Sequence, residues 1–436
     1  WYPVCAPRES YECRHGAGYS IFRNRTDGID ASWRIFVPRG EDPVELWTLQ
    51  FANRSRRDRR LSVFSVAELS LKTEFPLYGH EIYMRGLHLP GGNGVGTRKI
   101  AMNLPHPYFG AVLLSSRKPA SWDTDKAAFL GGEFESPAKP EAVRRGRCSG
   151  SLSSRALVLG ALHHRLTVRP GQTARLDLLA GACKVDQIPA EAARYRRKYL
   201  TGNGAAADRA FALMRKDVEN RLARVQMQTP DRKFNYVFNR WVPRLIELGA
   251  TLGRWGFFGF RDLVQQNQGA LTLGDSPKRR QRLEMAMSHQ WPTGYGVRSF
   301  PALHEDSTMK YADSALWLVS AVTEYLKETG NMAFLGHRLP YLGGGEGTVF
   351  QHLTRAMEAL SSGTGRHGLC LIHEGDWCDS MTHVGRKGRG ESVWMGWFLI
   401  AVIRSFAPIA RARGAADRAA TWDKHADALA GALQRH

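Results

Sequence analysis

The sequence lacks CxxC pairs, a signal peptide and any long apolar run. Its six cysteines are widely spaced along 436 residues, at Cys5, Cys13, Cys148, Cys183, Cys370 and Cys378. In a chain of this size, scattered cysteines are typical of reduced thiols in a cytoplasmic protein and argue against a disulfide scaffold. Because no apolar stretch approaches about 18 residues, the sequence supports neither secretion nor a membrane span.

Zinc-finger and RNA-binding motifs are also missing, although the chain is strongly basic. Its 61 lysines and arginines outnumber 41 acidic residues, giving a formal net charge of +20. Such a field attracts nucleic acids, and it also attracts small anions such as phosphate. The basic residues are scattered in short runs, for example at 54–60, 195–199 and 277–282. We therefore interpret most of them as solvated surface and expect no nucleic-acid partner.

The first part of the chain has the pattern of β-strands. Apolar and polar residues alternate between turn-forming residues in the segments 29–37, 44–51, 61–69, 109–116, 155–168 and 174–182. No amphipathic helix separates these strands, so the pattern predicts an N-terminal antiparallel β-sandwich over residues 1–188.

The apolar spacing then changes to three and four residues, which is typical of helices. We predict a helical linker over residues 189–230, followed by long apolar helices at 234–252, 314–330, 348–362 and 391–414. Gly330 is expected to cap the second of these at its C-terminus. Helix pairs joined by polar, glycine-rich loops favour an α/α toroid over residues 231–436. About 200 residues hold about half of a twelve-helix toroid, and the chain begins without Met, so we expect a part of a longer protein.

Two loops carry candidate site residues that each have a structural alternative. In the stretch 253–268, Arg254 and Arg261 could hold oxyanions or sugar hydroxyls, and Asp262 could accept from a diol. The same arginine and acid could instead brace a helix start. In the stretch 304–318, Asp313 precedes an apolar helix and could be its N-cap.

The alternative for Asp313 is catalytic. Tyr311 and Trp317 flank it in the sequence, and an apolar setting raises the pKa of a carboxyl group and keeps it protonated for acid catalysis.

Two further loops concentrate polar and aromatic residues. HEGDWCDSM (373–381) contains Asp376, Trp377 and Asp379, and a glycine-rich turn at 385–390 leads to Glu391 at the head of a helix. The first loop could be a metal site, a pair of catalytic carboxylates or the wall of a pocket. A metal site is disfavoured, because no second His/Cys cluster stands at the interval that a zinc site needs.

Six motifs occur in the order RHGAGYS (14–20), GFRD (259–262), ADSALWL (312–318), EYLKETGN (324–331), GDWCD (375–379) and GRGESVW (388–394). In sequence and order they resemble those of glycoside hydrolase family 94, which comprises cellobiose, cellodextrin and chitobiose phosphorylases. The resemblance implies a β-sandwich, a helical linker and an (α/α)6 barrel, the architecture that periodicity also predicts. It further implies a homodimer without a metal or other cofactor, with inorganic phosphate as co-substrate.

The resemblance also implies a reaction, the inverting phosphorolysis of a cellobiose-like β-glucoside to α-sugar 1-phosphate and a shortened acceptor. A hydrolase needs two carboxylates, whereas phosphate is already a nucleophile and leaves only an acid to be supplied. By position in the motifs, Asp313 is similar to the general acid. Substrate-binding roles fall to Arg254, Arg261 and Asp262 on the donor and phosphate side, to Asp376, Trp377 and Asp379 near the acceptor, and to Tyr311 and Glu391.

Departures from the family pattern leave the acceptor open. Ser314 and Gln266 replace acids that are common in relatives, and Cys378 replaces an asparagine. In the family, a later part of the barrel carries further phosphate ligands, a His and a Thr. We therefore expect these 436 residues by themselves to form an open barrel with little or no activity. Two alternatives remain: a hydrolase on the same toroid, with Asp376 or Asp379 as second carboxylate, and a non-catalytic carbohydrate-binding portion of a larger glucan synthase.

Overall fold

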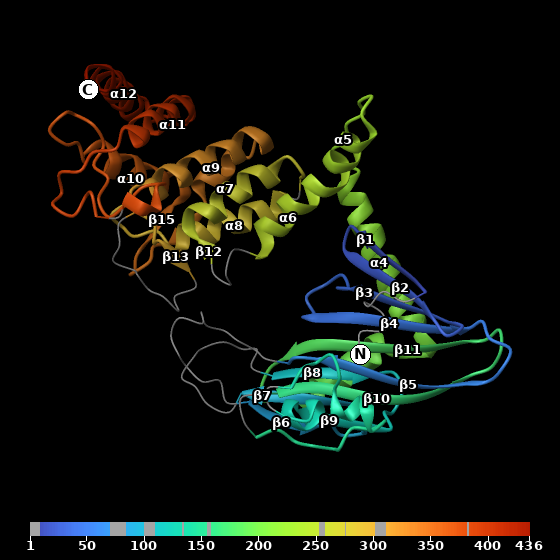
Figure 1. Cartoon of the computed structure of the whole chain (residues 1–436). Coiled ribbons are helices and arrows are strands. Elements are labelled where there is room, and N and C mark those ends of the chain that lie inside the picture. The colour runs from blue at the N-terminus through green and yellow to red at the C-terminus, as the bar shows by residue number, and fades with distance from the viewer. Residues whose placement is uncertain are drawn as a thin grey trace. The chain divides into compact units, whose positions relative to one another are not determined.

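The computed structural model describes residues 9–69, 84–99, 110–132, 135–154, 158–252, 258–274, 276–300, 311–381 and 383–436. The chain divides into two compact units, Trp1–Arg221 and Leu222–His436. Strands dominate the first unit and helices the second (Figure 1).

The first unit is an antiparallel β-sandwich, which confirms the predicted fold class. Its larger sheet has the order β1-β2-β3-β4-β11-β8-β7-β6, and its smaller sheet has the order β5-β10-β9. The strands of the larger sheet are β1 (Ser10–Gly16), β2 (Tyr19–Thr26), β3 (Ile29–Phe36), β4 (Val44–Asn53), β6 (Met84–His88), β7 (Gly94–Lys99), β8 (Gly110–Ser115) and β11 (Thr173–Cys183). The smaller sheet contains β5 (Arg59–Ala67), β9 (Ser121–Asp125) and β10 (Val158–Val168), and two short helices follow β9, α1 (Lys126–Leu130) and α2 (Glu141–Arg144).

Alternation along the strands builds the core between the two sheets. On β4, the side chains of Trp47, Leu49 and Phe51 are two residues apart and therefore lie on one face. They belong to a buried cluster that also includes Leu162 and Leu166 of β10 and Leu176 and Leu178 of β11. Alternation thus identifies the residues that face the other sheet, while strands such as β8 are buried on both faces.

Helices cover the other face of the larger sheet. They are α3 (Ile188–Tyr199) and, after the 3-10 turn Gly202–Gly204, α4 (Ala205–Leu222). The ring centroid of Phe211 on α4 lies 5.1 Å from that of Phe36 on β3 and 5.2 Å from that of Tyr19 on β2. The predicted helical segment therefore begins as part of the sandwich unit.

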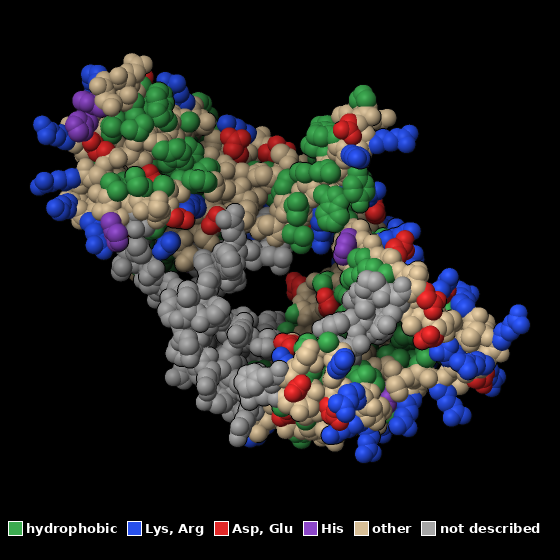
Figure 2. Space-filling view, in the orientation of Figure 1, with side chains coloured by type: hydrophobic (Ala, Val, Ile, Leu, Met, Phe, Trp, Pro, Cys, Tyr) green, Lys and Arg blue, Asp and Glu red, His purple; other side chains and the backbone are tan. Residues whose placement is uncertain are grey.

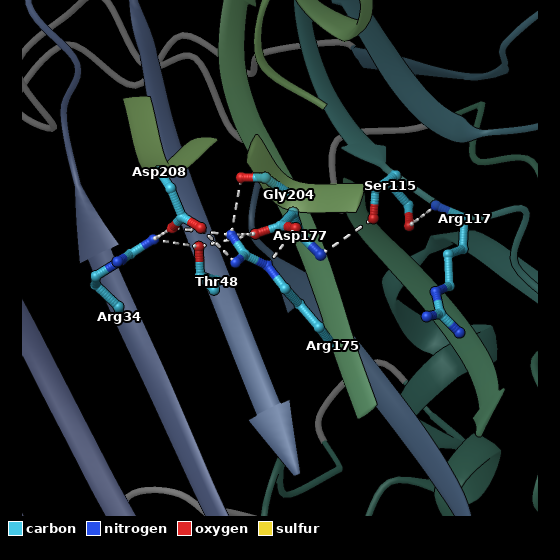
Figure 3. Close-up of polar contacts among 9 residues, drawn as sticks. Arg34, Thr48, Ser115, Arg117, Arg175, Asp177, Gly204 and Asp208 are labelled. Carbon is cyan, nitrogen blue, oxygen red and sulfur yellow. Dashed lines mark hydrogen bonds and ion pairs between the residues drawn. The ribbon is translucent and has the colours of Figure 1, made fainter. Parts of the chain in front are cut away.

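A polar network fastens α4 to this sheet (Figure 3). Asp177 on β11 is buried and accepts hydrogen bonds from Thr48 Oγ1 (2.8 Å) and Arg175 Nε (2.8 Å). Arg175 Nη1 also donates to Asp208 of α4 at 2.6 Å, and Arg34 Nη2 donates to the same carboxylate at 2.7 Å. The hydrogen bond from Arg175 holds the pKa of Asp208 below its usual value.

The close approach of Arg175 requires a glycine at position 204. Arg175 Nη2 donates to the carbonyl oxygen of Gly204 at 3.2 Å. A Cβ at this position would lie 2.3 Å from the Arg175 guanidinium carbon, and the residue has a φ of +95°. Both the space and the backbone conformation therefore exclude a side chain.

We predict that Gly204→Ala lowers the free energy of unfolding by about 2–4 kcal/mol, because the left-handed conformation and the contact with Arg175 both oppose a Cβ. Gly171→Ala is the matched control, since Gly171 has a φ of +71° with nothing within 4 Å of its Cβ position. Urea denaturation of both variants gives the two free energies. Equal losses would show that the contact with Arg175 carries no cost.

The second unit is helical, as the period of its apolar residues predicts. Its helices are α5 (Arg232–Tyr236), the π-helical turn Val237–Trp241, α6 (Val242–Leu252), α7 (Phe260–Leu271), α8 (Ser276–Ser288), α9 (Asp313–Thr329), α10 (Val349–Ser361), α11 (Val393–Ala412) and α12 (Ala416–Arg435). Short strands pair as β12 (Phe258–Gly259) with β13 (Ser299–Phe300) and β14 (Arg338–Pro340) with β15 (Glu346–Thr348), and 3-10 turns occur at Met332–Gly336 and Asp379–Met381.

Helix α9 lies at the centre of this unit. It packs against α7, α8, α10 and α11, and Leu316, Val319 and Val322 are completely buried. Gly330 ends the helix with a φ of +66°, and its N–H donates to the carbonyl oxygen of Leu326 at 2.9 Å, which confirms the predicted cap. Because its neighbours hold α9 on several sides, they also fix the position of its first residue, Asp313.

Among the described residues, α11 is long and apolar enough to cross a bilayer by length and composition alone. Ile403, Phe406 and Ala410 of this helix have no exposed surface and belong to the core around α9. Packing within the helical unit therefore accounts for its apolar composition.

The surface charges and the cysteines of the described residues bear on two interpretations of the sequence, and Cys5 lies outside those residues. On the face shown in Figure 2, lysine and arginine side chains are spread over strands and helices alike. Cys13, Cys148, Cys183, Cys370 and Cys378 are all free thiols.

Candidate active site

The starts of α7 and α9 bring Arg261 and Asp313 together. Arg261 lies in the first turn of α7, and Asp313 is the first residue of α9. Arg261 Nη1 donates to Asp313 Oδ2 at 3.2 Å, across 52 residues of sequence. The N-cap of α9 is Ala312, so the alternative interpretation of Asp313 as the N-cap is wrong.

The loop at 375–381 meets this pair. Arg261 Nη1 also donates to the backbone carbonyl oxygen of Asp376 at 2.7 Å, and Nη2 donates to Asp379 Oδ1. The N–H of Ala312 donates to the carbonyl oxygen of Gly375 at 3.1 Å, which holds the loop against the start of α9. One guanidinium thus joins two helix starts and one loop.

The carboxyl group of Asp313 is in the environment that acid catalysis requires. Its side chain is completely buried. Burial raises its pKa to about 6, although the charge of Arg261 opposes the increase, and the negative charge of Asp376 adds to it. Oδ2 faces Arg261, whereas Oδ1 has no hydrogen bond of good geometry within the described part of the chain, although the side chain of Trp317 is close enough to lower the pKa of Asp313. Asp313 can therefore carry a proton near pH 6 on an oxygen to which no described residue is firmly bonded.

Other buried polar atoms near the start of α9 similarly lack a firm hydrogen bond. Tyr311 Oη has no hydrogen-bond partner among the residues that the structure describes, and Trp317 Nε1 forms no bond of good geometry there but is close enough to Asp313 to lower its pKa. Trp317 is four residues after Asp313 and therefore lies on the same face of α9. Since buried polar groups are rarely left unpaired, these atoms are candidates for bonds to a bound ligand.

Two arginines flank the ring of Tyr311. The guanidinium carbon of Arg298 lies 5.2 Å from the ring centroid, and that of Arg261 lies 6.0 Å from it. The N–H of Phe260 donates to the carbonyl oxygen of Arg298 at 3.0 Å, so the pairing of β12 with β13 places this arginine beside α7. The sequence analysis did not identify Arg298 as a site residue. Glycines precede it in the sequence, and no local pattern predicts that it lies beside Tyr311.

Aromatic rings form one side of the same region. The ring centroid of Trp317 lies 4.5 Å from that of Phe398 and 6.3 Å from that of Trp394, both on α11. Trp394 is 39 % exposed, so part of its indole is open to solvent. The sequence analysis assigned no function to Trp394. Its aromatic side chain and its position in the motif GESVW were signals that could have identified it as a site residue.

The predicted substrate residues of the 375–381 loop are arranged in two different ways. The carboxylate of Asp376 is buried, and its Oδ1 accepts from the N–H of Cys378 at 2.8 Å while Oδ2 accepts from Ser392 Oγ at 2.6 Å. By contrast, Trp377 is 54 % exposed and the side chain of Asp379 is 62 % exposed. Trp377 and Asp379 are accessible to a substrate, whereas both carboxylate oxygens of Asp376 are already occupied.

The side chain of Glu391 contacts the turn at residues 365–369 and not the 375–381 loop. Its carboxylate accepts from His367 Nδ1 at 2.6 Å and from the backbone N–H groups of His367 (3.0 Å) and Leu369 (3.3 Å). Burial raises its pKa, but the hydrogen bonds from His367 outweigh burial, and the net pKa is below the usual value. These contacts brace the 365–369 turn and give no support to the predicted substrate role of Glu391.

The remaining predicted residues are Asp262 and Arg254. Asp262 is in the first turn of α7, where a negative charge interacts favourably with the helix dipole. Its carboxylate lies against Gly259, so closely that a Cβ at position 259 would overlap with Oδ2. Arg254 lies outside the described residues. In the described ranges, no group of three or more His, Cys, Asp or Glu side chains could hold a metal ion.

A β-sandwich followed by helices, with a buried acid beside an arginine, defines the sandwich-plus-toroid class of carbohydrate-active proteins. Residues 1–200 match the glycosyl hydrolase 94 supersandwich domain, and residues 218–436 match the catalytic domain of the glycosyl hydrolase 94 superfamily. The chain therefore belongs to glycoside hydrolase family 94.

Curated relatives include phosphorylases and a synthase. The chain is 34% identical to solabiose phosphorylase from Paenibacillus borealis over 94% of its own length and 52% of that protein. It is 27% identical to N,N'-diacetylchitobiose phosphorylase from Vibrio furnissii, over 98% and 56% respectively. It is also 29% identical to the cyclic beta-(1,2)-glucan synthase NdvB from Rhizobium meliloti, over 100% of this chain and 16% of the synthase. The chain thus spans about half the length of the phosphorylases that it matches.

Solved structures show the same fold. A bacterial glucoamylase complexed with acarbose matches 97% of this chain and 58% of that chain, at a TM-score of 0.58 and 9% identity. A putative kojibiose phosphorylase from human microbiome matches 94% and 54% respectively, at a TM-score of 0.51 and 9% identity. At this identity the likeness concerns the fold alone.

The raised pKa of Asp313 predicts a pH-dependent stability. An acid whose pKa is higher in the folded state than in the unfolded state binds more protons when the protein is folded. Its contribution to the free energy of unfolding is therefore largest at low pH and decreases as pH rises from about 4 to about 6. We expect the unfolding free energy of the unsubstituted chain to fall by about 2–3 kcal/mol relative to Asp313→Asn across this window. Urea denaturation at several pH values measures the difference.

Asp379→Asn is the control for this measurement, because its carboxylate is largely exposed and pairs with the same arginine. Parallel stability curves for the unsubstituted chain and Asp313→Asn would contradict the raised pKa.

Proposed function

We propose that this protein catalyses the inverting phosphorolysis of a β-glucoside disaccharide or oligosaccharide by inorganic phosphate. The products are an α-sugar 1-phosphate and a shortened acceptor. The single observation that carries the proposal is the buried carboxyl group of Asp313, with a pKa of about 6, one oxygen beside Arg261 and the other not firmly bonded by any described residue.

In the proposed reaction, Asp313 gives its proton to the glycosidic oxygen from Oδ1. The bond between the anomeric carbon and this oxygen breaks, and the acceptor leaves with the proton as a hydroxyl group. A phosphate oxygen forms its bond to the anomeric carbon from the opposite face, which inverts the configuration. Arg261 then stabilises the Asp313 carboxylate through Oδ2, so the cation that opposes protonation before the reaction is useful after it.

Substrate recognition is proposed for the side chains that remain accessible or unpaired. Tyr311 Oη is available to a sugar hydroxyl, the exposed indole of Trp377 can stack on a sugar ring, and Asp379 can accept from its hydroxyls. Arg254 and Asp262 stay predictions on the donor and phosphate side. The basic balance of the chain favours the approach of phosphate.

The relatives support phosphorolysis and leave the acceptor open. The names of the phosphorylase relatives specify solabiose, N,N'-diacetylchitobiose, a glucosyl glucuronide and cellobionic acid. A cellobiose-like substrate, a homodimer and a cytoplasmic location are therefore our proposals for this protein, based on the motifs and on its free thiols.

Hydrolysis on the same toroid is the first alternative. An inverting hydrolase needs a second carboxylate that activates water across the sugar from the acid. Both oxygens of Asp376 are engaged by Cys378 and Ser392, and Asp379 is paired with Arg261. Asp376 is therefore unsuited to act as the base, whereas Asp379 is largely exposed and stays a candidate, so the phosphate dependence of the reaction has to decide between hydrolysis and phosphorolysis.

A non-catalytic portion of a larger glucan synthase is the second alternative. The match to NdvB over the whole of this chain motivates it. Calorimetry that detects oligosaccharide binding without turnover in the presence of phosphate would favour this alternative.

The test is to incubate the complete purified enzyme, with the later part of its barrel, with cellobiose and phosphate and to measure α-glucose 1-phosphate. We expect product only with phosphate, with kcat/KM decreasing as pH rises through about 6, because Asp313 must be protonated. Asp313→Asn should lower kcat by at least about a hundredfold. Glucose release without phosphate would instead indicate a hydrolase.

Glu358→Gln is the matched acid-to-amide control, since Glu358 forms an exposed pair with Arg418 away from these residues. It should retain normal turnover. Near-normal phosphorolysis by Asp313→Asn would show that another group is the acid.

A further inference from the structure

The helix-covered face of the larger sheet carries a hollow next to the contacts of α4. On β3, Arg34 donates to Asp208 of α4, and Figure 3 shows Arg34 and Arg175 both reaching this carboxylate. Ser32 and Asp30 lie two and four residues before Arg34 on the same strand, and therefore on the same face. There the sheet forms a hollow of about 460 Å³, within the range of roughly 300–1,000 Å³ that is typical of sites for small ligands. The side chains that line it include Glu12, Arg23, Arg25, Asp30, Gln50 and Arg54.

The register of the sheet brings these side chains together from neighbouring strands. Arg23 of β2 lies opposite both Glu12 of β1 and Ser32 of β3. Ser32 in turn lies opposite Gln50 of β4. Residues opposite one another on adjacent strands share a face of the sheet, so the floor of the hollow is a mixed set of charged and uncharged polar groups.

Two acids hold the arginines of the hollow in place. The carboxylate of Asp30 accepts from Arg25 Nε at 2.7 Å and from Arg54 Nε at 2.8 Å. The hydrogen bond from Arg25 lowers the pKa of Asp30, so this acid is ionised at neutral pH and holds both guanidiniums. Glu12 holds the third arginine, since it accepts from Arg23 Nη1 at 2.9 Å.

These arginines keep N–H groups that no described residue uses. Arg54 donates through Nε and Arg23 through Nη1, which leaves both Nη groups of Arg54 and the Nε and Nη2 groups of Arg23 without a partner among the described residues. The side chains of Arg23, Arg25 and Arg54 are all more than half exposed. A guanidinium presents its N–H groups in a fixed plane that matches the paired oxygens of a carboxylate or phosphate. Because the arginines of the lining outnumber its acids, a negatively charged ligand complements the hollow.

Uncharged hydrogen-bonding groups lie beside the guanidiniums. The hydroxyl groups of Ser32 and Thr173 and the amide group of Gln50 line the hollow and form no hydrogen bond within the described part of the chain. Hydroxyl and amide groups can both donate to and accept from the hydroxyl groups of a sugar. An inorganic anion alone would leave them unused.

We infer that this hollow binds a saccharide that carries an oxyanion, either a phosphate or a carboxylate group. The guanidiniums hold the oxyanion, and the uncharged side chains bond to the sugar hydroxyls. The inference concerns the first unit and does not depend on the reaction proposed for the helical unit.

The experiment is a calorimetric titration of the full chain with glucose 6-phosphate, glucuronic acid, glucose and inorganic phosphate, at about 0.15 M salt. We expect a Kd at or below about 1 mM for at least one of the two acidic sugars, and binding of glucose that is at least about tenfold weaker. Tighter binding of glucose 6-phosphate assigns a phosphate group to the ligand, whereas tighter binding of glucuronic acid assigns a carboxylate.

Two substitutions test whether the ligand lies in the hollow. Arg25→Gln removes a charged donor and should raise Kd by at least about tenfold. Gln50→Ala breaks no ion pair and should raise Kd by at least about threefold. Arg145→Gln is the matched control, since Arg145 Nε also donates to an acid, Glu141, at 2.6 Å, and its side chain is more than half exposed outside the hollow. Its Kd should equal that of the unsubstituted chain.

Circular dichroism establishes that each variant is folded, and if Arg25→Gln is not, Gln50→Ala decides alone. An unchanged Kd in the folded variants would overturn the inference, because the ligand would then bind elsewhere. An equal loss in Arg145→Gln would overturn it as well, since the overall positive charge would account for the effect. The inference is also wrong if neither acidic sugar binds, or if inorganic phosphate binds as tightly as the preferred sugar.

Discussion

The guanidinium of Arg261 is the interaction on which the helical unit's candidate site depends. It binds the Asp313 carboxylate, the Asp376 carbonyl and the Asp379 carboxylate, so it joins α7, α9 and the 375–381 loop. A planar donor with several fixed N–H groups suits this task, whereas a lysine ammonium would not reproduce the geometry. The backbone bond from Ala312 to Gly375 also ties α9 to the loop, and Arg261 adds the connection to α7.

Two opposing effects on Asp313 make it useful. Burial at the start of a central helix penalises the carboxylate, and the nearby arginine reduces that penalty. Burial alone would fix the proton on the acid, and an unopposed arginine would remove it. The balance leaves a pKa near the middle of the range in which a group can both give and regain a proton. Among the described residues, Oδ1 lacks a hydrogen bond of good geometry, and a ligand hydroxyl or glycosidic oxygen could supply one.

Much of this arrangement could be predicted from the sequence, because periodicity reports burial. The period of two along β4 identified the face that packs into the sandwich, and the apolar residues around Asp313 predicted its buried setting. The partners of individual acids could not be predicted. Asp376 and Asp379 are three residues apart in one loop, yet one is buried against Ser392 and the other is exposed beside Arg261.

Contacts between residues that are distant in the sequence explain why the other site contacts could not be predicted. Glu391 and Ser392 are adjacent, and the structure directs one to the 365–369 turn and the other to Asp376. A serine before an apolar helix is a recognisable N-cap signal, but nothing local indicates that it also donates to a distant carboxylate. Arg298 reaches Tyr311 only because β12 pairs with β13.

The division of labour within the 375–381 loop has an evolutionary consequence. Asp376 fixes the backbone through buried bonds, while Trp377 and Cys378 project to the surface and take no part in that fixation through their side chains. Substitutions at positions 377 and 378 can accumulate without displacing the carbonyl that restrains Arg261. Under the proposed function, sugar preference could therefore change at this loop without a change in the contacts around Arg261.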